Sequence, residues 1–284
     1  MTTATEAIQA PAQRVRTSPL AFVRRHVLTV YSLLVFAYLL LPIVIVVLFS
    51  FNEPKGRFNV VWNHFTWDNW VNWDAVSGIR GAIEVSLEVA AIASIAATAL
   101  GTLIALALVR YRFRGRGSTN LLIFLPMASP EIVLGAALLT LFLSVNVELG
   151  FWTITIAHVM FCISYVVVTV KARLVSFDRH LEEAAMDLGA NEWITFRKVT
   201  LPLIAPAVLA AGLLVFALSV DDFVITNFNA GTTVTFPLFV WGAARVGAPP
   251  QVNVIGSAIF VAALSVMVVN VIVQTRRRPT AQPA

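Results

Sequence analysis

Six long apolar runs follow one another along the chain, and each is long enough to cross a lipid bilayer as a helix. The runs cover roughly residues 27–51, 82–108, 121–145, 151–170, 203–222 and 253–273. A helix needs about 20 apolar residues to span the hydrocarbon core, where backbone polar groups must bond within the segment. The pattern predicts an all-α polytopic membrane protein with six transmembrane helices in a domain of residues 27–275, flanked by tails at 1–26 and 276–284.

Composition agrees with a membrane protein, and the motifs that are absent argue against several kinds of chemistry. Of the 284 residues, 58% are hydrophobic and only 12% are charged, well below the charged share of a soluble domain. The single cysteine, Cys162, excludes an intramolecular disulfide. The chain has no G-x-x-x-x-G-K-[ST] phosphate loop, so it is not expected to hydrolyse ATP itself. No nucleophile–base arrangement favours an enzyme.

Basic residues gather at the ends of the apolar runs on one side. Four lie in the N-terminal tail, four between the second and third runs, five between the fourth and fifth, and three in the C-terminal tail, so sixteen of the 20 share one side. The positive-inside rule places that side, with both termini, in the cytoplasm. Because these residues adjoin the spans, topology explains them better than nucleic-acid binding, and no nucleic-acid partner is expected.

The polar segment of residues 171–202 joins the fourth and fifth runs on this cytoplasmic side. Asp178 is expected to cap a first helix that continues to about Leu188, with Gly189 as its stop. Asn191 is expected to cap a second helix that runs toward Leu201 and ends before a proline, Pro202.

Within this segment, Glu-Ala-Ala at 183–185 is followed by three residues, Gly189, nine residues, an aliphatic residue, one residue and Leu-Pro at 201–202. This spacing resembles the coupling loop of permease subunits in ATP-binding-cassette (ABC) importers. The resemblance implies two short helices that dock into a groove on a separate ATPase subunit. The coupling residues are then Glu183, Ala184, Ala185, Asp187, Gly189, Leu201 and Pro202. The alternative is a solvated linker that merely joins two spans.

Acidic residues are the second unusual feature, because a charge at mid-span costs about 2.5–3.5 kcal/mol on insertion scales. The runs contain no lysine or arginine. An acid-only lining suits a cationic substrate, which the field of the carboxylates stabilises. The residues assigned to the substrate pathway are Glu84, Glu88, Glu131, Asp221 and Asp222.

Glu131 follows two prolines, Pro126 and Pro130, that disrupt the third run. Ser129 is expected to cap a restarted helix, with Pro130 and Glu131 as its first two residues. Broken helices of this kind mark binding sites in transporters, and Glu131 is expected near mid-membrane as a substrate or gating group. The alternative is a structural carboxylate held at its own helix end.

The other four acids have plainer alternatives. Asp221 and Asp222 end the fifth run, where one could contact substrate while the other caps or pairs, or both could belong to an ordinary hydrated helix end. Glu84 and Glu88 stand at i and i+4 on one helix face, where an interfacial or packing role is as well supported as a place in the pathway.

Several other features are interpreted as structural. His158 and Cys162 are too few for a metal site, and none is expected. The alanine-rich residues 90–99 with Gly101 predict close helix packing. The four tryptophans within residues 62–73 are interpreted as an aromatic belt at the membrane surface, with docking of a binding protein as the alternative.

Three further phrases resemble the spermidine/putrescine permease subunits of ABC importers. They are Ser-Pro-Glu-Ile-Val at 129–133, Gly-Phe-Trp at 150–152 and Leu-Ser-Val-Asp-Asp-Phe-Val at 218–224. The resemblance covers roughly residues 80–275. It implies the type I ABC importer permease fold, a bacterial inner-membrane location, and a polyamine substrate with cation contacts at Glu131, Asp221 and Asp222.

The resemblance also implies the partners of the chain. They are a dimer of ATPase subunits that hold ATP and magnesium, a second and different homologous permease subunit, an extracytoplasmic substrate-binding protein, and the lipid bilayer; the chain itself is expected to bind no cofactor. Two alternatives stay open. One is an ABC permease for ferric iron, thiamine or an aminophosphonate, and the other is an ion-coupled secondary transporter or channel.

Overall fold

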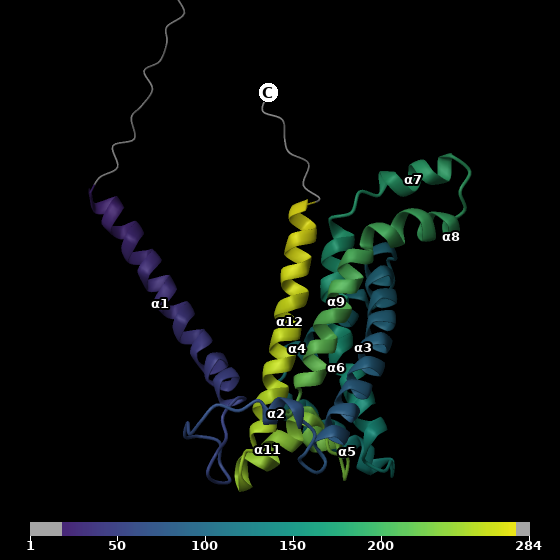
Figure 1. The fold of residues 1–284 in the computed structure, drawn as a ribbon. Coiled ribbons are helices and arrows are strands. Elements are labelled where there is room, and N and C mark those ends of the chain that lie inside the picture. Colours follow the sequence, from purple (N-terminus) through teal and green to yellow (C-terminus); the bar gives the residue numbers. More distant parts are fainter. Residues whose placement is uncertain (1–18, 277–284) are drawn as a thin grey trace, which may run out of the picture.

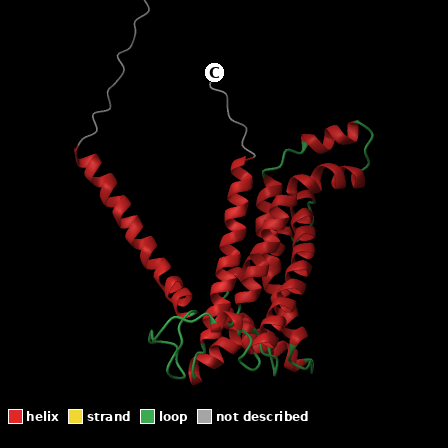
Figure 2. Ribbon diagram, in the orientation of Figure 1, coloured by secondary structure: helices red, strands yellow, loops and turns green. Residues whose placement is uncertain are grey.

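The computed structural model describes residues 19–276, and helices form its framework (Figures 1 and 2). The elements are α1 (Pro19–Phe49), α2 (Asp68–Val71), α3 (Ile79–Arg110), α4 (Arg116–Ala128), α5 (Glu131–Ser144), α6 (Phe151–Val175), α7 (His180–Asp187), α8 (Glu192–Thr195), the π-helix η1 (Phe196–Thr200), α9 (Leu201–Asp221), α10 (Val224–Asn229), α11 (Phe236–Val246) and α12 (Pro250–Arg276). Within this part of the chain no strand occurs, only an isolated bridge between Asn52 and Phe65. The all-α prediction is confirmed, and residues 1–18 and 277–284 of the predicted tails lie outside the described residues.

Four segments are long and apolar enough to cross a membrane. They are His26–Phe49 within α1, α3, α6, and the segment Glu192–Asp221 that ends with α9. The bent pair of α4 and α5 makes a fifth if it is counted as one span. The sixth predicted run falls within α12, so a count of six stays a prediction. A multi-pass membrane protein is nevertheless clear from the helices that qualify.

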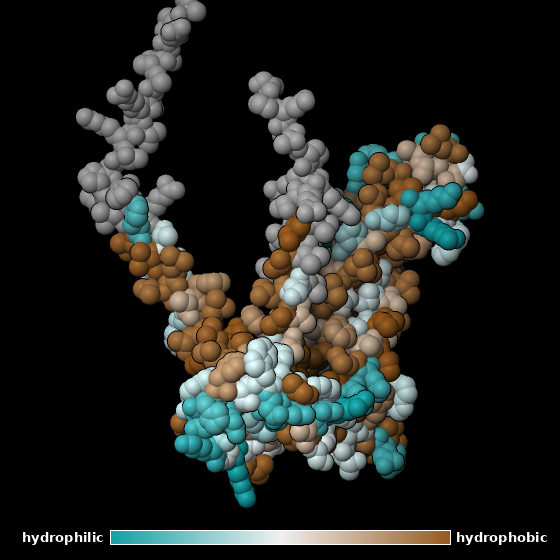
Figure 3. Space-filling model, viewed as in Figure 1, coloured by the Kyte–Doolittle hydropathy of each residue, from teal (hydrophilic) through white to brown (hydrophobic). Residues whose placement is uncertain are grey.

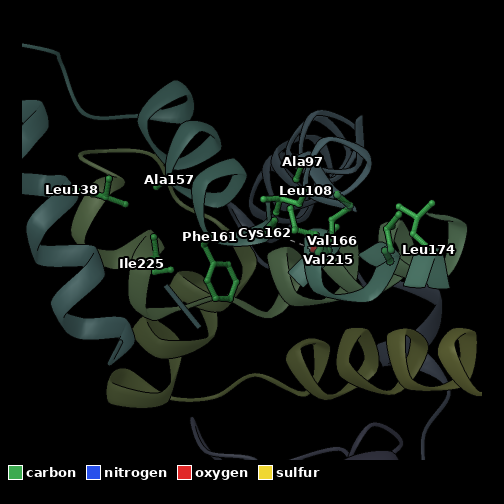
Figure 4. Packing of buried hydrophobic residues seen from close by; sticks show 14 of the residues in the cluster. Ala97, Leu108, Leu138, Ala157, Phe161, Cys162, Val166, Leu174, Val215 and Ile225 are labelled. Carbon is green, nitrogen blue, oxygen red and sulfur yellow. Dashed lines mark hydrogen bonds between the residues drawn. The ribbon is translucent and has the colours of Figure 1, made fainter. Parts of the chain in front are cut away.

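Helices α3, α6 and α9 form the centre of the bundle, and α3 and α6 make the most extensive contact (Figure 1). Small residues allow this approach, since Ala93 and Ala97 on α3 are fully buried. A Cβ atom added to Gly101 would lie 2.7 Å from the Cβ of Val166 on α6. The predicted close packing is confirmed. Figure 4 shows the apolar cluster that results, which includes Ala97, Cys162 and Val215.

The bundle has two different ends. A hairpin made of α7 and α8 projects from one of them, here called the hairpin end, where α1 begins and α12 ends (Figure 1). The opposite end, here called the cap end, carries α2, α5 and α11 with their loops. Figure 3 shows apolar surface along the helices and hydrophilic surface gathered at the cap end and on the hairpin. Helix α1 leans away from the bundle and makes its main helix contact with α12.

The third predicted span is broken, as its two prolines predict. The axes of α4 and α5 differ by 109° across Ser129 and Pro130. The predicted cap is wrong by one residue: Ser129 is the C-cap of α4, Pro130 is the N-cap of α5, and Glu131 is the first residue of α5. The shift arises because Pro130 itself has extended backbone, with ψ of 131°, and its carbonyl accepts from Val133 N at 2.9 Å.

The fifth span begins earlier than predicted. The second hairpin helix does not end before Pro202, because α8, η1 and α9 form one continuous helical segment, Glu192–Asp221. The π turn of η1 ends two residues before Pro202, which sits in the first turn of α9. A proline inside a helix lacks an N–H donor and crowds the preceding turn, and the wider π turn accommodates both defects.

Candidate functional site

The hairpin at residues 178–195 is built from local hydrogen bonds. The Asp178 carboxylate accepts from the His180 amide at 3.0 Å, although Arg179 occupies the N-cap, so α7 starts one residue later than predicted. At its end Gly189 has a φ of +87°, and the amides of Gly189 and Ala190 donate to carbonyls two and three positions inside the helix end, in the Schellman arrangement. Asn191 Oδ1 accepts from the Ile194 amide at 2.8 Å and caps α8. The predicted stop at Gly189 and the predicted cap at Asn191 are confirmed.

A buried ion pair fastens this hairpin to the bundle. Glu182 of α7 contacts both the guanidinium of Arg110, the last residue of α3, and the hydroxyl of Thr200 in η1. Arg110 Nη2 also donates to Thr200 Oγ1 at 3.2 Å. The Glu182–Arg110–Thr200 cluster therefore joins three elements. Sequence reasoning missed it because Arg110 lies 72 positions from Glu182, and no local spacing indicates the pair.

The residues predicted for ATPase coupling occupy two places. Glu183, next to the buried Glu182, keeps 60% of its side chain exposed and contacts His180 Nδ1 at 3.1 Å. Ala184, Asp187 and Gly189 are exposed, and Ala185 is half-buried. Leu201 and Pro202 lie apart from these, at the base of the hairpin in the first turn of α9. The structure thus gathers the first five on α7 and its stop, and leaves the last two where the hairpin joins the bundle.

Asp222 is held by its surroundings and is only 6% exposed. Its carboxylate accepts from the Thr226 amide at 2.8 Å and from the Thr226 hydroxyl at 2.9 Å, at the start of α10. His158 Nε2 of α6 lies 3.2 Å from Asp222 Oδ2 and 2.9 Å from Thr226 Oγ1, while Nδ1 meets Ser219 Oγ of α9 at 2.6 Å. Because the one hydroxyl hydrogen of Thr226 goes to Asp222, Nε2 is the donor to Thr226.

This network corrects the interpretation of His158 as a packing residue, since it hydrogen-bonds three helices together. Cys162, one turn away, is fully buried and free, as a packing residue should be. Among the described residues no group of three histidine, cysteine or acidic side chains could hold a metal ion. The sequence signal that could have been used is the rarity of histidine in a span, where an ionisable side chain requires a partner.

The four remaining acids differ in whether their carboxylates have a hydrogen-bonding or ion-pair partner. Glu84 pairs with Arg80 at 2.9 Å, because α3 begins at Ile79 and brings an arginine into its first turn. Glu84 is therefore a paired carboxylate, and its place in the substrate pathway stays a prediction. Glu88, Glu131 and Asp221 are exposed and have no hydrogen bond or ion pair within the part of the chain that is described.

The helix that follows the break in the third span packs on the helix that follows the fifth span. Helix α5 packs on α10, where Asn229 Nδ2 donates to the Gly135 carbonyl at 3.4 Å. Glu131 starts the first of these helices, and Asp221 and Asp222 lie at the end of α9, just before the N-cap of the second. The Glu131 carboxylate also lies within electrostatic range of the Tyr165 phenol on α6. Acid-bearing segments that are about 90 positions apart in the chain are thus in one packed unit.

The tryptophan-rich residues 50–73 form a small folded cap. Asn52 donates to Asn59 Oδ1 at 2.7 Å and accepts from the Asn63 amide at 2.8 Å. The Phe51 ring packs against Trp67 at 4.9 Å and Trp70 at 5.4 Å between ring centroids. These rings therefore pack into a local aromatic cluster, which sequence reasoning did not anticipate. The aromatic-belt interpretation stays a prediction for the tryptophans that are exposed.

Comparison with known proteins agrees with this architecture. The profile of a family described as "binding-protein-dependent transport system inner membrane component" matches residues 97–278. The chain is 41% identical over 245 residues, 84% of its length and 93% of the relative's, to the spermidine/putrescine transport system permease protein PotC of Haemophilus influenzae. It is 38% identical over 238 residues, 81% of its length and 84% of the relative's, to the putrescine transport system permease protein PotI of Escherichia coli K12.

Solved structures show the same fold at low sequence identity. A bacterial ABC transporter involved in the import of the acidic polysaccharide alginate matches with a TM-score of 0.63 and 19% identity, over 92% of this chain and 99% of that one. An amino acid ABC transporter matches with a TM-score of 0.55 and 15% identity, over 76% of this chain and all of that one. The profile match covers more than half of the chain and the relatives align over most of it, so the chain belongs to the family of binding-protein-dependent transport system inner membrane components.

Proposed function

We propose that the chain is a non-catalytic permease subunit of an ATP-driven importer and forms half of a membrane pathway for a polyamine. The observation that carries the proposal is the continuous helical segment Glu192–Asp221, 30 residues long. It begins in the hairpin and ends at the exposed acid Asp221. At 1.5 Å per residue it is about 45 Å long, so a displacement of the hairpin is transmitted to the acidic turn at the cap end.

The hairpin has the properties of a docking element. Leu188 at its turn is 89% exposed, and Met186, Trp193 and Ile194 beside it are exposed as well. Exposed apolar side chains on a projecting element favour contact with another protein. The partner is an ATPase subunit, one of a dimer that holds ATP and magnesium, and Glu183 and Gly189 belong to the docked surface. The Glu182–Arg110–Thr200 cluster makes this surface part of the bundle, so force is not lost in a loose linker.

The orientation follows from charge. The basic residues between the second and third runs and between the fourth and fifth lie at the hairpin end, where α1 begins and α12 ends. We place this end, and both termini, in the cytoplasm. The spans are then six: α1, α3, the broken pair α4 and α5, α6, the segment that ends with α9, and α12. The domain limits of 27–275 stay as predicted.

The substrate class follows from the free carboxylates. Glu88, Glu131 and Asp221 are exposed and unpaired among the described residues, which suits a cation with two or more charges. Asp222 has a positioning role in this proposal, because His158 and Thr226 occupy its oxygens. Relatives named for spermidine and putrescine support the polyamine over ferric iron, thiamine or an aminophosphonate.

The pathway needs further subunits. A second, homologous permease completes it across an interface, and a substrate-binding protein delivers the cation at the cap end. A solved relative of this fold has been seen in complex with a periplasmic binding protein loaded with an alginate pentasaccharide. Closure of the ATPase dimer moves the hairpin, the bundle opens outward to take the cation, and release of the dimer returns it to the inward-open state.

Uptake by the reconstituted complex tests this function. The complex of both permeases, the ATPase and the binding protein is placed in proteoliposomes, and uptake of labelled putrescine and spermidine is measured. We expect Glu131→Gln and Asp221→Asn to lower uptake while the complex still assembles. Glu84→Gln is the matched control, because that carboxylate is already paired with Arg80.

Two results would contradict the proposal. Robust uptake of another solute without polyamine uptake would show that the substrate is not a polyamine. Transport by this chain alone, without the ATPase, would favour the ion-coupled transporter.

A further inference from the structure

A pocket of about 270 Å³ opens beside the base of the hairpin, between α3, α4, α6 and α7. Four basic side chains and one acidic side chain line its polar part, which leaves a net charge of +3. They are Arg110, Arg116, Lys171, Arg179 and Glu182. The pocket lies at the hairpin end, and none of the free carboxylates Glu88, Glu131 and Asp221 lines it. It also includes none of the exposed apolar residues at the hairpin turn.

The basic side chains of this pocket differ in whether a carboxylate neutralises them. Arg110 is engaged by Glu182, so these two neutralise one another. Lys171 Nζ donates to Asn120 Oδ1 at 2.7 Å, which orients the ammonium without neutralising it. Arg116 and Arg179 have no carboxylate partner within the part of the chain that is described. The pocket therefore presents three uncompensated cations to one volume, which is a binding site for an anion with several acceptor oxygens.

The position of the pocket indicates where that anion comes from. Arg110 ends α3 and Arg116 begins α4, so the polar part lies at the level where spans leave the hydrocarbon core. The remaining wall is apolar, with Val109, Val175 and Phe177 among its residues. A basic pocket with an apolar wall at this depth fits a phospholipid, whose phosphate meets the cations while the adjoining chain meets the apolar wall.

We propose that this pocket binds a phosphate group, carried by an anionic phospholipid of the inner leaflet. Lys171 belongs to α6, Arg116 to α4 and Arg179 to the start of α7, so one phosphate held by all three bridges the hairpin to two spans. The bound lipid then stiffens the attachment that the Glu182–Arg110–Thr200 cluster already provides. The proposal rests on the cytoplasmic orientation given under the proposed function, and it adds anionic lipid as a ligand that tunes coupling.

Lipid retention by the assembled complex tests this site without any transport measurement. The complex is exchanged into nanodiscs of phosphatidylcholine with or without phosphatidylglycerol, extracted gently, and the bound lipid is counted by native mass spectrometry. The test variant is Arg116→Gln with Arg179→Gln. The control is Arg112→Gln with Arg114→Gln, which removes the same charge from the same end but from exposed positions outside the pocket.

We expect the wild type to retain phosphatidylglycerol in preference to phosphatidylcholine. The test variant should bind it about 30-fold more weakly, as expected when two basic residues stop contributing at the lipid surface, and the control should behave as wild type. Equal retention in the two variants, or no preference for phosphatidylglycerol, overturns the site. A parallel arm adds inorganic phosphate to phosphatidylcholine nanodiscs. If the pocket binds inorganic phosphate in these nanodiscs but does not retain phosphatidylglycerol, and if that binding depends on the same two arginines, the ligand is free phosphate and the lipid proposal is overturned.

Because lipid retention is counted without polyamine or ATP, a negative result leaves the proposed transport function intact. A failure of polyamine uptake likewise leaves the lipid result standing.

Discussion

The substitution Glu182→Gln isolates the attachment of the hairpin. Glutamine keeps the shape of the side chain and can still bond Thr200, so the change removes mainly the charge that faces Arg110. The Glu182 side chain is 7% exposed and that of Arg110 is 26% exposed. Breaking a fully buried ion pair costs about 3–5 kcal/mol. Since the arginine retains contact with water, we expect a smaller loss of about 2 kcal/mol in the free energy that holds α7 against the bundle.

Hydrogen–deuterium exchange of the α7 amides measures this quantity. If these amides exchange when the hairpin detaches locally, a loss of about 2 kcal/mol makes their exchange about 30-fold faster. Exchange in α3 and α6 should change little, because their mutual packing is untouched. In the reconstituted complex the same variant should hydrolyse ATP with less uptake per turnover, since α7 then moves without moving the segment Glu192–Asp221 to the same extent.

Glu183→Gln is the matched control for this experiment. It removes the same charge one residue away, from a side chain that is 60% exposed and contacts only the exposed His180. Exposed pairs contribute little, so α7 exchange should stay within about twofold of wild type. The argument fails if Glu183→Gln accelerates exchange as much as Glu182→Gln, or if Glu182→Gln leaves exchange unchanged.

Three further predictions concern local geometry. Gly189→Ala forces a Cβ into a φ of +87° at a cost of about 1–2 kcal/mol, and should lower uptake and speed exchange at the end of α7, whereas Gly117→Ala, with open space at its Cβ, should do neither. Asp222→Asn weakens the bonds to His158 and Thr226 and should lower the melting temperature of the purified chain by an amount that corresponds to about 1–3 kcal/mol, while Asp221→Asn should leave melting unchanged. Gly101→Leu should destabilise the bundle by about 1–3 kcal/mol or more, and Val166→Ala should restore part of the loss.

Much of the architecture could be predicted because its signals are local. The break of the third span follows from two prolines one turn apart, and the structure bends by 109° there. The hairpin turn follows from Gly189 and Asn191, whose hydrogen bonds reach at most five residues along the chain. The length and apolarity of the runs predicted most of the spans. This signal is also local, because a helix in lipid makes all its backbone hydrogen bonds within itself.

The continuous helix through Pro202 could not be predicted in this way. A proline after a polar segment favours a boundary, and the expectation of a helix that ends before it was reasonable. The structure instead opens a π turn at residues 196–200, where Thr200 is held by Glu182 and Arg110. The partners that hold this turn are 18 and 90 positions away from Thr200. A long-range contact therefore holds the π turn that accommodates Pro202.

By itself the sequence determined the all-α membrane fold, the broken span, the hairpin and its family resemblance. Tertiary structure alone decided which of two neighbouring acids is buried: Glu182 and not Glu183 meets Arg110, and Asp222 and not Asp221 meets His158. Glu182 and Glu183 point about 100° apart around α7, whereas Asp222 follows the end of α9 with extended backbone, so the two acids of each pair enter different environments. Which environment is polar depends on residues 72 and 64 positions away, brought there by packing of α3, α6 and α9. No pattern within a single helix carries that information.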